Sequence, residues 1–463
     1  MPSVSSASTS SMTPPVPVRR PAWAEGLDGL RAAATTEPGR LRAIGAVLVL
    51  LLAVFGATTA WQVTERAAAA DDVVEHSQPL TAVAAGIYRS LADADTAAAA
   101  GFLKGGEGSK ETRERYDRDI ATAGELLVKA SRNGRGTDGA EKQIARLSWQ
   151  LPRYTGLVET ARAHNRQGLP LGGAYLRYAN ERMRTELLPA ARALYDTETD
   201  RLAADYASAE AWPWFALASG ALALGALGWA QRRHYRRTNR VFNRGLLAAT
   251  AASVAVLSWL AVGHAVAREG LTESYEHGAR SLRVLHEARI DALQARGDEN
   301  LTLVARGAVL TEDQQDFYEA GFRNGMKDLA GTGDHGAAAA TGRLGAALAL
   351  ADDEAGRGPV RDALTYARQW QARHAQARTA DEKGDYEQAL ERVTGADGST
   401  GESFDGVAAG LRKALEHEQA QFRSAADGGR GAFGGLPVGA GALLALAAAG
   451  AVLGIGRRLA EYR

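Results

Sequence analysis

The chain contains no cysteine and few aromatic residues, and these shortages exclude several classes of protein. Without cysteine, its 463 residues can form no disulfide framework, thiol nucleophile or thiolate metal site. Aromatic residues make up only 6% of the chain, so large interior side chains are scarce. The 54 basic and 54 acidic side chains cancel, and no segment interleaves basic with aromatic residues. We therefore expect no nucleic-acid partner.

Small residues and arginine dominate what is present. The chain has 95 alanines and 52 glycines, and 47 of its 54 basic residues are arginine. Alanine thus supplies much of the 46% of residues that count as hydrophobic. This composition predicts either an alanine-rich helical protein or a membrane protein.

Four uncharged stretches are long enough to cross a bilayer, whose hydrocarbon core of about 30 Å requires about 20 helical residues. Tryptophans lie within or at the ends of several stretches, where an aromatic belt is expected. A cleaved signal peptide is disfavoured for the first stretch because its leader is too long and further spans follow. We predict transmembrane helices at 44–63, 212–230, 245–266 and 436–456, the last within an uncharged stretch that begins at Gly431.

The distribution of arginine predicts the orientation. Loop 231–244 carries six arginines and no acidic residue, and leader 1–43 and tail 457–463 are also net basic. Positive segments stay in the cytoplasm, so segments 64–211 and 267–435 are placed outside. The prediction is a multi-pass plasma-membrane protein with both termini cytoplasmic. The Ser/Thr/Pro-rich start of the leader lacks periodicity and is predicted to be disordered.

The two outer segments share a pattern that indicates an internal duplication. Each contains apolar positions spaced alternately three and four residues apart, as in the seam of a helical bundle. A constant offset of 216 residues aligns the two seams without a gap, and each segment lies between two predicted spans. The seams are Ile144, Leu147, Leu151, Tyr154, Val158 and Ala161 in the first segment, and Val360, Ala363, Ala367, Trp370, His374 and Ala377 in the second.

Helix lengths and breaks predict a four-helix bundle in each outer segment. In the first segment the predicted turns are 104–110, 131–139 and 165–173. In the second segment, glycine-rich breaks are predicted at 331–336, 356–359 and 395–401. The predicted fold class is therefore an all-α membrane protein with four transmembrane helices and two duplicated extracytoplasmic helical domains.

The sequence contains no recognisable catalytic, metal-binding or phosphate-binding motif. The nine histidines form no HExxH motif and no pair with carboxylates at metal-ligand spacing, and there is no P-loop or GxSxG motif. We expect no cofactor, no metal and no enzymatic activity. His374 occupies a seam position, where it is expected to be a core histidine bonded to neighbouring helices rather than a pH sensor or ligand-binding group.

Two sets of polar residues are candidates for partner binding. The first set lies in the predicted helix turns of the outer segments, and the second is the arginine-rich loop, which is also expected to contact anionic membrane lipids. The first set comprises Lys104, Lys110, Asn165, Arg166, Asp381 and Lys383. The second comprises Arg232, Arg233, Arg236, Arg237 and Arg240. The GxxxG at Gly450 to Gly454 would let two helices approach closely.

This arrangement of four spans, internal termini, duplicated outer segments and an arginine-rich inner loop resembles the actinobacterial GlnX family. The outer bundles also resemble chemoreceptor sensor domains. The GlnX resemblance implies a signal relay between an extracytoplasmic amino-acid-binding lipoprotein, of the glutamate or glutamine class, and a cytoplasmic Ser/Thr kinase of the PknG type. It rests on architecture and composition, so no binding residue is transferred.

Two other functions remain open at this point. One is an FtsX-like membrane subunit of an ATPase-coupled transport or envelope complex, whose outer domains are expected to contain strands. The other is a direct small-molecule receptor, testable with glutamate, glutamine and aspartate. A homodimer is also predicted, because long bundle helices expose more apolar seam than one chain buries.

Overall fold

The computed structural model describes residues 37–105, 109–133, 138–238, 243–331, 341–431 and 436–460. These residues are helical almost throughout and form no strand, although Leu310 and Asp316 make an isolated antiparallel bridge. The predicted all-α class is therefore confirmed. The predicted disordered start of the leader lies outside the described residues.

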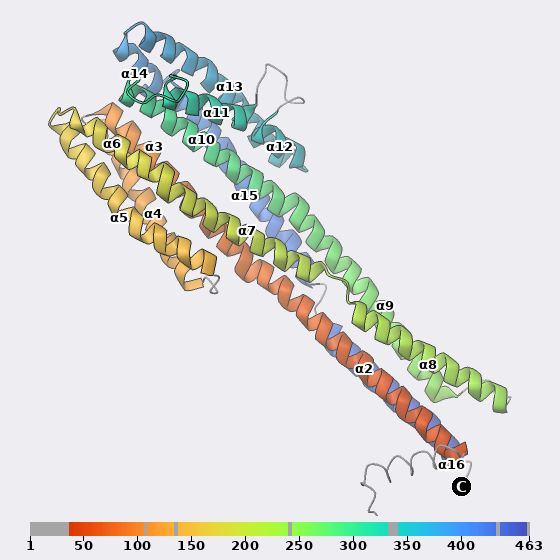
Figure 1. The fold of residues 1–463 in the computed structure, drawn as a ribbon. Helices are drawn as coiled ribbons and strands as arrows, with labels where there is room; N and C mark the ends of the chain where they lie inside the picture. Colours follow the sequence, from red (N-terminus) through yellow and green to blue (C-terminus); the bar gives the residue numbers. More distant parts are fainter. Residues whose placement is uncertain are drawn as a thin grey trace, which may run out of the picture. The chain divides into compact units, whose positions relative to one another are not determined.

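Eighteen helical elements follow one another along the described chain (Figure 1). Up to the arginine-rich loop they are α2 (Glu37–Asp72), η1 (Val73–Ser77), α3 (Gln78–Lys104), α4 (Ser109–Asn133), α5 (Asp138–Arg166), α6 (Leu171–Arg182), η2 (Met183–Leu187), α7 (Leu188–Glu210) and α8 (Trp214–Thr238). After it they are α9 (Arg244–Glu273), η3 (Ser274–Ala279), α10 (Arg280–Ala305), α11 (Phe317–Ala330), α12 (Arg343–Leu350), α13 (Glu354–Glu382), α14 (Tyr386–Thr394), α15 (Thr400–Gly431) and α16 (Leu436–Ala460).

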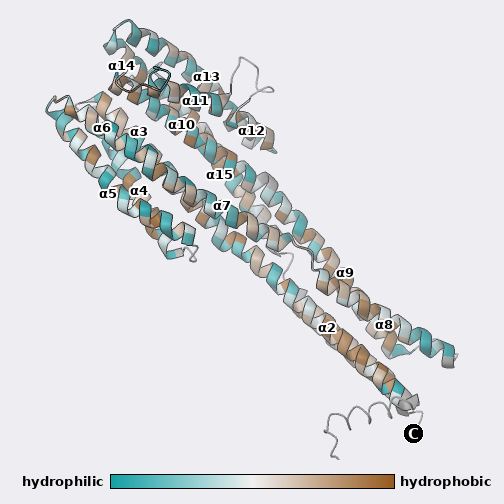
Figure 2. Cartoon of the chain, viewed as in Figure 1, coloured by the Kyte–Doolittle hydropathy of each residue, from teal (hydrophilic) through white to brown (hydrophobic). Residues whose placement is uncertain are grey.

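Four described helical stretches are long and apolar enough to cross a membrane, which confirms the predicted number of spans. They are Gly39–Lys104, Leu171–Arg236, Arg244–Glu273 and Val438–Gly456. Hydrophobic residues concentrate along α2, α8 and α9 (Figure 2). Their length and composition indicate a membrane protein.

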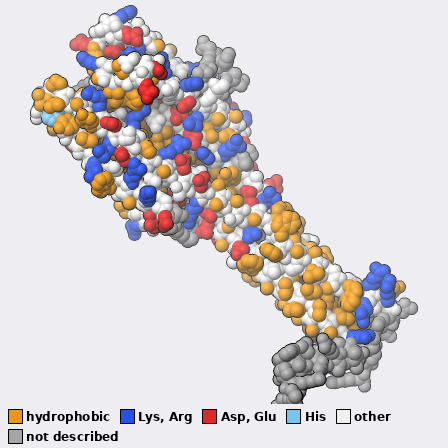
Figure 3. All heavy atoms as spheres, in the orientation of Figure 1, with side chains coloured by type: hydrophobic (Ala, Val, Ile, Leu, Met, Phe, Trp, Pro, Cys, Tyr) orange, Lys and Arg blue, Asp and Glu red, His pale blue; other side chains and the backbone are white. Residues whose placement is uncertain are grey.

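Contacts divide the chain into two compact units. The first, which we call the apolar unit, is formed by described residues within Met1–Gln62, Pro213–Leu260 and Pro437–Arg463. Its core contains side chains from α2, α8, α9 and α16, including Phe55, Leu227, Leu246 and Leu444. Other large apolar side chains of these helices are exposed, and they form the hydrophobic surface visible in Figure 3. Such a surface suits a lipid environment.

The GxxxG motif of α16 packs inside this unit. A Cβ placed on Gly245 of α9 would lie 2.6 Å from the Cα of Gly454, so only a hydrogen fits there. Asn243 strengthens the contact, because its Nδ2 donates to the carbonyl oxygen of Gly454 at 2.8 Å and its Oδ1 accepts from the Gly245 N–H at 3.1 Å. Small residues thus let α9 and α16 approach closely.

The second unit, which we call the large unit, comprises Val63–Trp212 and Ala261–Leu436, so both predicted outer segments contribute to it. Helices α3 and α10 form its centre, and most residues from Val83 to Ala99 and from Ser281 to Ala305 are buried on every side. Alanine and glycine make this possible, since their small side chains let neighbouring helices surround a central one.

The aligned seams lie on helices of equal length. Helices α5 and α13 both contain 29 residues, and their bounds differ by the predicted offset of 216 at both ends. The seam residues Leu147, Tyr154 and Val158 of α5 are buried, as are their aligned counterparts in α13. These facts agree with a duplication, which stays a prediction.

One predicted break is wrong. Residues 356–359 lie inside α13 rather than in a loop. The side chain of Asp353 caps this helix by accepting from the Gly356 N–H at 2.8 Å, which satisfies a backbone donor of the first turn. Residues 395–399 of the break predicted at 395–401 separate α14 from α15, whereas Thr400 and Gly401 already belong to α15. Most of the predicted break at 331–336 lies outside the described residues.

Three π-helical turns interrupt the long helices in the described part of the large unit. Turns η1 and η2 each end two residues before a proline, Pro79 and Pro189 respectively. Because proline has no N–H and its ring crowds the carbonyl of the preceding turn, a wider turn accommodates it without breaking the helix. Each such turn changes the direction in which the neighbouring side chains point.

Candidate functional site

Four of the predicted partner-binding residues lie at helix ends near the end of α3. Lys104 is the last residue of α3, and Lys110 is the second residue of α4; both are exposed. Arg166 is the exposed last residue of α5. Asn165 is half-buried, and its Nδ2 donates to the carbonyl oxygen of Phe102 at 3.1 Å. This bond joins the end of α5 to the end of α3.

Asp381 and Lys383 lie at the end of α13. Asp381 pairs with Arg378 at 2.5 Å, and Lys383 is exposed. A small core beside them contains Ala380, and Leu103 of α3 packs against it. The structure therefore brings turns from both segments to one end of the large unit. We call the six residues Lys104, Lys110, Asn165, Arg166, Asp381 and Lys383 the tip surface.

The predicted arginine set belongs to the apolar unit. Arg232 and Arg236 are exposed on the last turns of α8, and Arg233 is half-buried, with its guanidinium 5.5 Å from the centre of the Trp229 ring. Basic side chains gather at this end of α8 in Figure 3. Arg240 and the side chain of Arg237 lie outside the described residues.

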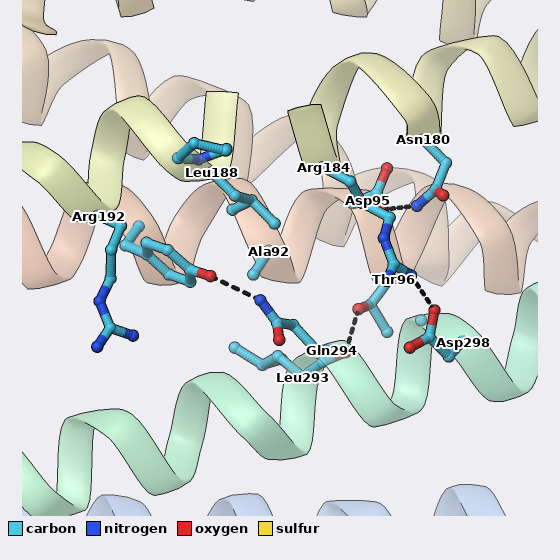
Figure 4. A pocket seen from close by; sticks show the side chains of 13 residues that line it. Ala92, Asp95, Thr96, Asn180, Arg184, Leu188, Arg192, Leu293, Gln294 and Asp298 are labelled. Atoms are coloured by element: carbon cyan, nitrogen blue, oxygen red, sulfur yellow. Dashed lines mark hydrogen bonds and ion pairs between the residues drawn. The ribbon is translucent and has the colours of Figure 1, made fainter. Parts of the chain in front are cut away.

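The large unit also contains a cavity of about 330 Å³ between α3, α10 and the α6–η2–α7 stretch (Figure 4). This volume is at the lower end of the range for small-molecule sites. The cavity is lined by Tyr88, Ala92, Asp95, Thr96, Asn180, Arg184, Leu188, Pro189, Arg192, Leu293, Gln294, Gly297 and Asp298.

Asp95 is a buried charged group of the cavity wall. Its carboxylate accepts hydrogen bonds from Asn180 Nδ2 at 2.6 Å and from the Tyr154 hydroxyl at 3.1 Å. Burial raises the pKa of Asp95 to about 6, although these two bonds and the charge of Arg184 oppose the rise. A buried carboxylate held by neutral donors carries a negative charge that a ligand can neutralise.

The second carboxylate of the wall, Asp298, forms an ion pair with Arg184. Burial raises the pKa of Asp298 to about 6 despite this arginine. Arg184 belongs to η2, so a π-helical turn places the arginine that faces the cavity. Single π-helical turns inside α-helices are frequent at functional sites.

Two hydrogen bonds across the cavity link α3 to α10. Gln294 Nε2 donates to the Tyr88 hydroxyl at 2.7 Å, and the Thr96 hydroxyl donates to the carbonyl oxygen of Leu293 at 3.2 Å. Figure 4 shows both bonds and places Arg192 at the opposite end of the cavity from Asp95 and Asp298. The wall is thus made by both segments of the chain.

A second polar cluster surrounds His374. Its Nδ1 lies 2.9 Å from Glu299 of α10, and its Nε2 lies 3.0 Å from Glu319 of α11. Burial alone would lower the pKa of His374, but the two carboxylates raise it to about 9. Glu299 also accepts from Trp370 Nε1 at 3.0 Å and pairs with Arg296. His374 is therefore a core histidine bonded to neighbouring helices, with carboxylates as its partners.

Sequence reasoning missed the cavity residues because their partners are distant along the chain. Tyr88 and Gln294, for example, are separated by 206 positions. One signal was available. Asp95 lies inside the alanine-rich run LADADTAAAA, and Asp298 lies in GDEN within a helical stretch. The surrounding alanines make a carboxylate such as Asp95 unusual for a solvated helix face, but Asp93 beside it, and Arg296 and Glu299 beside Asp298, made this signal too weak to identify the site.

Comparison with known proteins supports a sensing role. Residues 69–207 match the family model described as an actinobacterial sensor domain. No curated protein and no solved structure matches the chain. The matched residues include Asp95, Asn180, Arg184 and Arg192 of the cavity wall, together with four residues of the tip surface. The match and the four apolar helices together indicate an actinobacterial membrane-associated sensor protein.

Proposed function

We propose that the protein is a transmembrane signal relay in the plasma membrane. In this proposal it passes the state of an extracytoplasmic amino-acid-binding lipoprotein, of the glutamate or glutamine class, to a cytoplasmic Ser/Thr kinase. The observation that carries the proposal is the match of residues 69–207 to a sensor domain in a chain with four apolar helices. The resemblance to the GlnX family supplies the classes of partner.

Helix continuity offers a route for the signal. The stretch Gly39–Lys104 is helical throughout and contains both an apolar window and the central helix α3. A small rotation or shift of α3 on binding would be carried along this helix, because packed helices move between discrete arrangements. The arrangement supports a sensor in which one continuous helical stretch, made of α2, η1 and α3, contributes residues to both the large unit and the apolar unit.

The tip surface is the proposed docking site for the lipoprotein. It combines four cationic side chains, Lys104, Lys110, Arg166 and Lys383, with polar groups from two segments. The arginines of α8 and the loop after it are the proposed contact for the kinase and for anionic lipids.

The proposal also places both termini in the cytoplasm and includes a homodimer. A monomer measured by light scattering in detergent would contradict the dimer.

Crosslinking in native membranes tests the relay. Mass spectrometry of the purified complex is expected to recover a solute-binding lipoprotein and a soluble kinase. Substituting Lys104, Lys110 and Arg166 with glutamate should abolish the lipoprotein crosslink and keep the kinase crosslink. A matched control reverses three exposed charges elsewhere, at Arg361, Arg412 and Lys413. Recovery of an ATPase in place of the kinase would contradict the relay.

The FtsX-like alternative is less well supported. It predicts strands in the outer domains, and within the described ranges of those segments the chain forms helices and only one isolated bridge.

A direct small-molecule receptor is the second candidate, and the cavity favours it. The cavity has an adequate volume and contains buried charged groups on its wall, as ligand sites commonly do. Calorimetry of the purified chain with glutamate, glutamine and aspartate tests this function for those three ligands. Absence of heat with all three would exclude them as ligands.

A further inference from the structure

We propose that the cavity between α3, α10 and the α6–η2–α7 stretch binds a small molecule through an ammonium group, which lies against Asp95 and Asp298. This inference rests on the second candidate function, the direct receptor, and names its ligand class. It does not depend on the lipoprotein or the kinase.

The charge balance at one end of the cavity carries the argument. Asp95 and Asp298 are 8% and 4% exposed, and the cationic side chain of the wall at this end is Arg184. Arg184 already pairs with Asp298, whereas the hydrogen bonds to Asp95 come from the neutral groups of Asn180 and Tyr154. Two carboxylates against one guanidinium leave one negative charge, which is costly in a buried site unless a cation accompanies it.

The other end of the cavity does not supply that cation. Arg192 lies 3.5 Å from Asp196 and 3.7 Å from Glu287, so carboxylates of the protein already accompany its charge. Figure 4 shows its guanidinium directed away from the Asp95 end. The residues of the wall thus supply no second cation at the Asp95 end, and in the proposed site the ligand provides it.

The geometry suits an ammonium group in particular. An ammonium presents three donors, and carboxylate and amide oxygens are its usual acceptors. Besides the carboxylates, the wall supplies the amide oxygens of Asn180 and Gln294, whose nitrogens already donate to Asp95 and Tyr88. Each amide orientation is thus set by a bond within the protein, leaving its oxygen as an acceptor for the ligand.

The surrounding residues limit the size of the ligand. Ala92, Gly297 and Leu293 leave a space of about 330 Å³, which holds an amino acid or a short diamine. A Cβ placed on Gly297 would meet the Thr96 hydroxyl at 3.7 Å, so larger side chains at this position would project into the site. The pKa values of about 6 at Asp95 and Asp298 fit carboxylates that lack a full counter-charge.

Isothermal titration calorimetry of the full chain in lipid nanodiscs tests the proposal. The probes are putrescine, which has ammonium groups and no carboxylate, and L-glutamine, which has both. Their matched controls are butanediol and N-acetyl-L-glutamine, which lack a cation. We expect at least one probe to bind and its control without a cation to remain silent. Binding of putrescine indicates an amine ligand, and binding of L-glutamine alone indicates an amino acid.

Variants connect the binding to the cavity. Asp95→Asn and Asp298→Asn should each weaken the bound probe by about tenfold or more, since a charge-assisted bond becomes a neutral one. Gly297→Leu should abolish binding by filling the cavity, and the exposed Asp405→Asn should leave it unchanged. Thermal melting verifies that each variant is folded.

Three results would overturn the proposal. These are silence of both probes with the folded wild-type chain, equal binding of a control that lacks a cation, or undiminished affinity in both folded aspartate variants. The lipoprotein and kinase crosslinks are scored on the same samples. If the probes fail to bind but both crosslinks form, the ligand site is wrong and the relay is still supported. If a probe binds but the crosslinks are absent, the relay is wrong and the ligand site is still supported.

Discussion

At the scale of single residues, the large unit buries several ionisable groups in an alanine-rich interior. Asp95, Asp298, Glu299 and His374 are each less than 10% exposed. The two clusters differ in how their charges are balanced. His374 lies between two carboxylates, which pair with arginines as well, whereas Asp95 has only neutral donors. The carboxylates beside His374 stabilise its charged form, whereas burial destabilises the charged form of Asp95 by more than its hydrogen bonds and Arg184 stabilise it.

Asp95→Asn should therefore stabilise the ligand-free protein at alkaline pH. The folded pKa of Asp95, about 6, is higher than its unfolded value of 3.8, so its ionisation costs stability above about pH 6. That cost disappears as the pH falls through 6 towards 4. We expect a gain of about 1 to 3 kcal/mol near pH 8 and no gain near pH 4. Thermal melting across this pH range measures it.

The control is Asp405→Asn, which removes an exposed carboxylate and should give no pH-dependent difference. Asn180 and Tyr154 donate to different carboxylate oxygens of Asp95, so in Asp95→Asn the amide oxygen can accept from Asn180 while the amide N–H donates to the Tyr154 hydroxyl oxygen. A lower melting temperature of Asp95→Asn at about pH 8 would contradict the account of an uncompensated charge.

His374→Gln should have the opposite effect. The pKa of His374 is about 9 when folded and 6.5 when unfolded, so its charge contributes stability fully below about pH 6.5 and loses it as the pH rises through 9. The glutamine variant keeps a hydrogen-bonding side chain but cannot carry that charge. We expect a loss of about 1 to 3 kcal/mol near pH 6 that shrinks above pH 9, measured by chemical unfolding.

His417 provides the comparison for His374. It pairs with Asp353 at 3.0 Å in a partly exposed position, and such pairs contribute little. His417→Gln should therefore change stability by no more than about 0.5 kcal/mol. An equal effect of the two substitutions would show that burial between Glu299 and Glu319 is not what makes His374 important.

At the scale of elements, sequence periodicity predicted features that depend on a single helix, such as its buried face. It missed features that depend on several helices, such as which of them lie at the centre of the large unit. The three-four spacing identified the buried face of α5 and α13, because a seam such as Leu147, Tyr154 and Val158 repeats along one helix. The spans were predictable since apolar length alone decides them. In α3 and α10, burial on all sides removes the periodic signal, so sequence patterns could not show that these helices are central.

Local composition also gave a wrong prediction where a helix cap starts a helix ahead of a glycine and a proline. Gly356 and Pro359 indicated a loop, yet Asp353 starts α13 before them and the helix continues through both. The cavity was unpredictable for a related reason. Arg184 and Asp298 meet only because the stretch formed by α6 and η2 lies beside α10, and nothing within either segment records that contact.

The close approach of α9 and α16 gives a prediction at this scale. A Cβ placed on Gly450 would lie 3.9 Å from the Cβ of Ala248, a separation typical of disulfides. Because the chain has no cysteine of its own, the double variant Ala248→Cys with Gly450→Cys should form one intramolecular disulfide on oxidation. Peptide mass spectrometry under non-reducing conditions detects it.

Gly441 provides the matched control on the same helix, since a Cβ there meets no atom within 4 Å. The pair Ala248→Cys with Gly441→Cys should stay reduced under the same conditions. Equal crosslinking of both pairs would mean that α9 and α16 are not held in register by Gly245, Asn243 and Gly454.

At the scale of the whole molecule, the described chain forms an apolar unit and a large unit, and helix α2 contributes residues to both. The cavity, the His374 cluster and the tip surface all belong to the large unit. The arginines of α8 belong to the apolar unit. In the proposed relay, the groups that receive a signal and those that pass it on are therefore carried by different units of one chain.

In the proposed relay, the large unit and the arginines of α8 lie on opposite sides of the membrane. Labelling of single introduced cysteines measures on which side each one lies. In intact cells, a membrane-impermeant maleimide should label Ser131→Cys, an exposed position at the end of α4, and should not label Tyr235→Cys near the arginines of α8. The reason is that positive segments remain in the cytoplasm during insertion. The wild-type chain is the background control, because it has no cysteine to react.

Permeabilising the membrane is expected to make Tyr235→Cys reactive and to leave the labelling of Ser131→Cys unchanged. Tyr235 is 50% exposed, so a lack of labelling in intact cells reflects the membrane barrier rather than burial. Labelling of Tyr235→Cys before permeabilisation, with Ser131→Cys protected, would show that the orientation in the membrane is the reverse of the predicted one. In that case the tip surface would face the cytoplasm, and a lipoprotein could no longer be the partner that docks there.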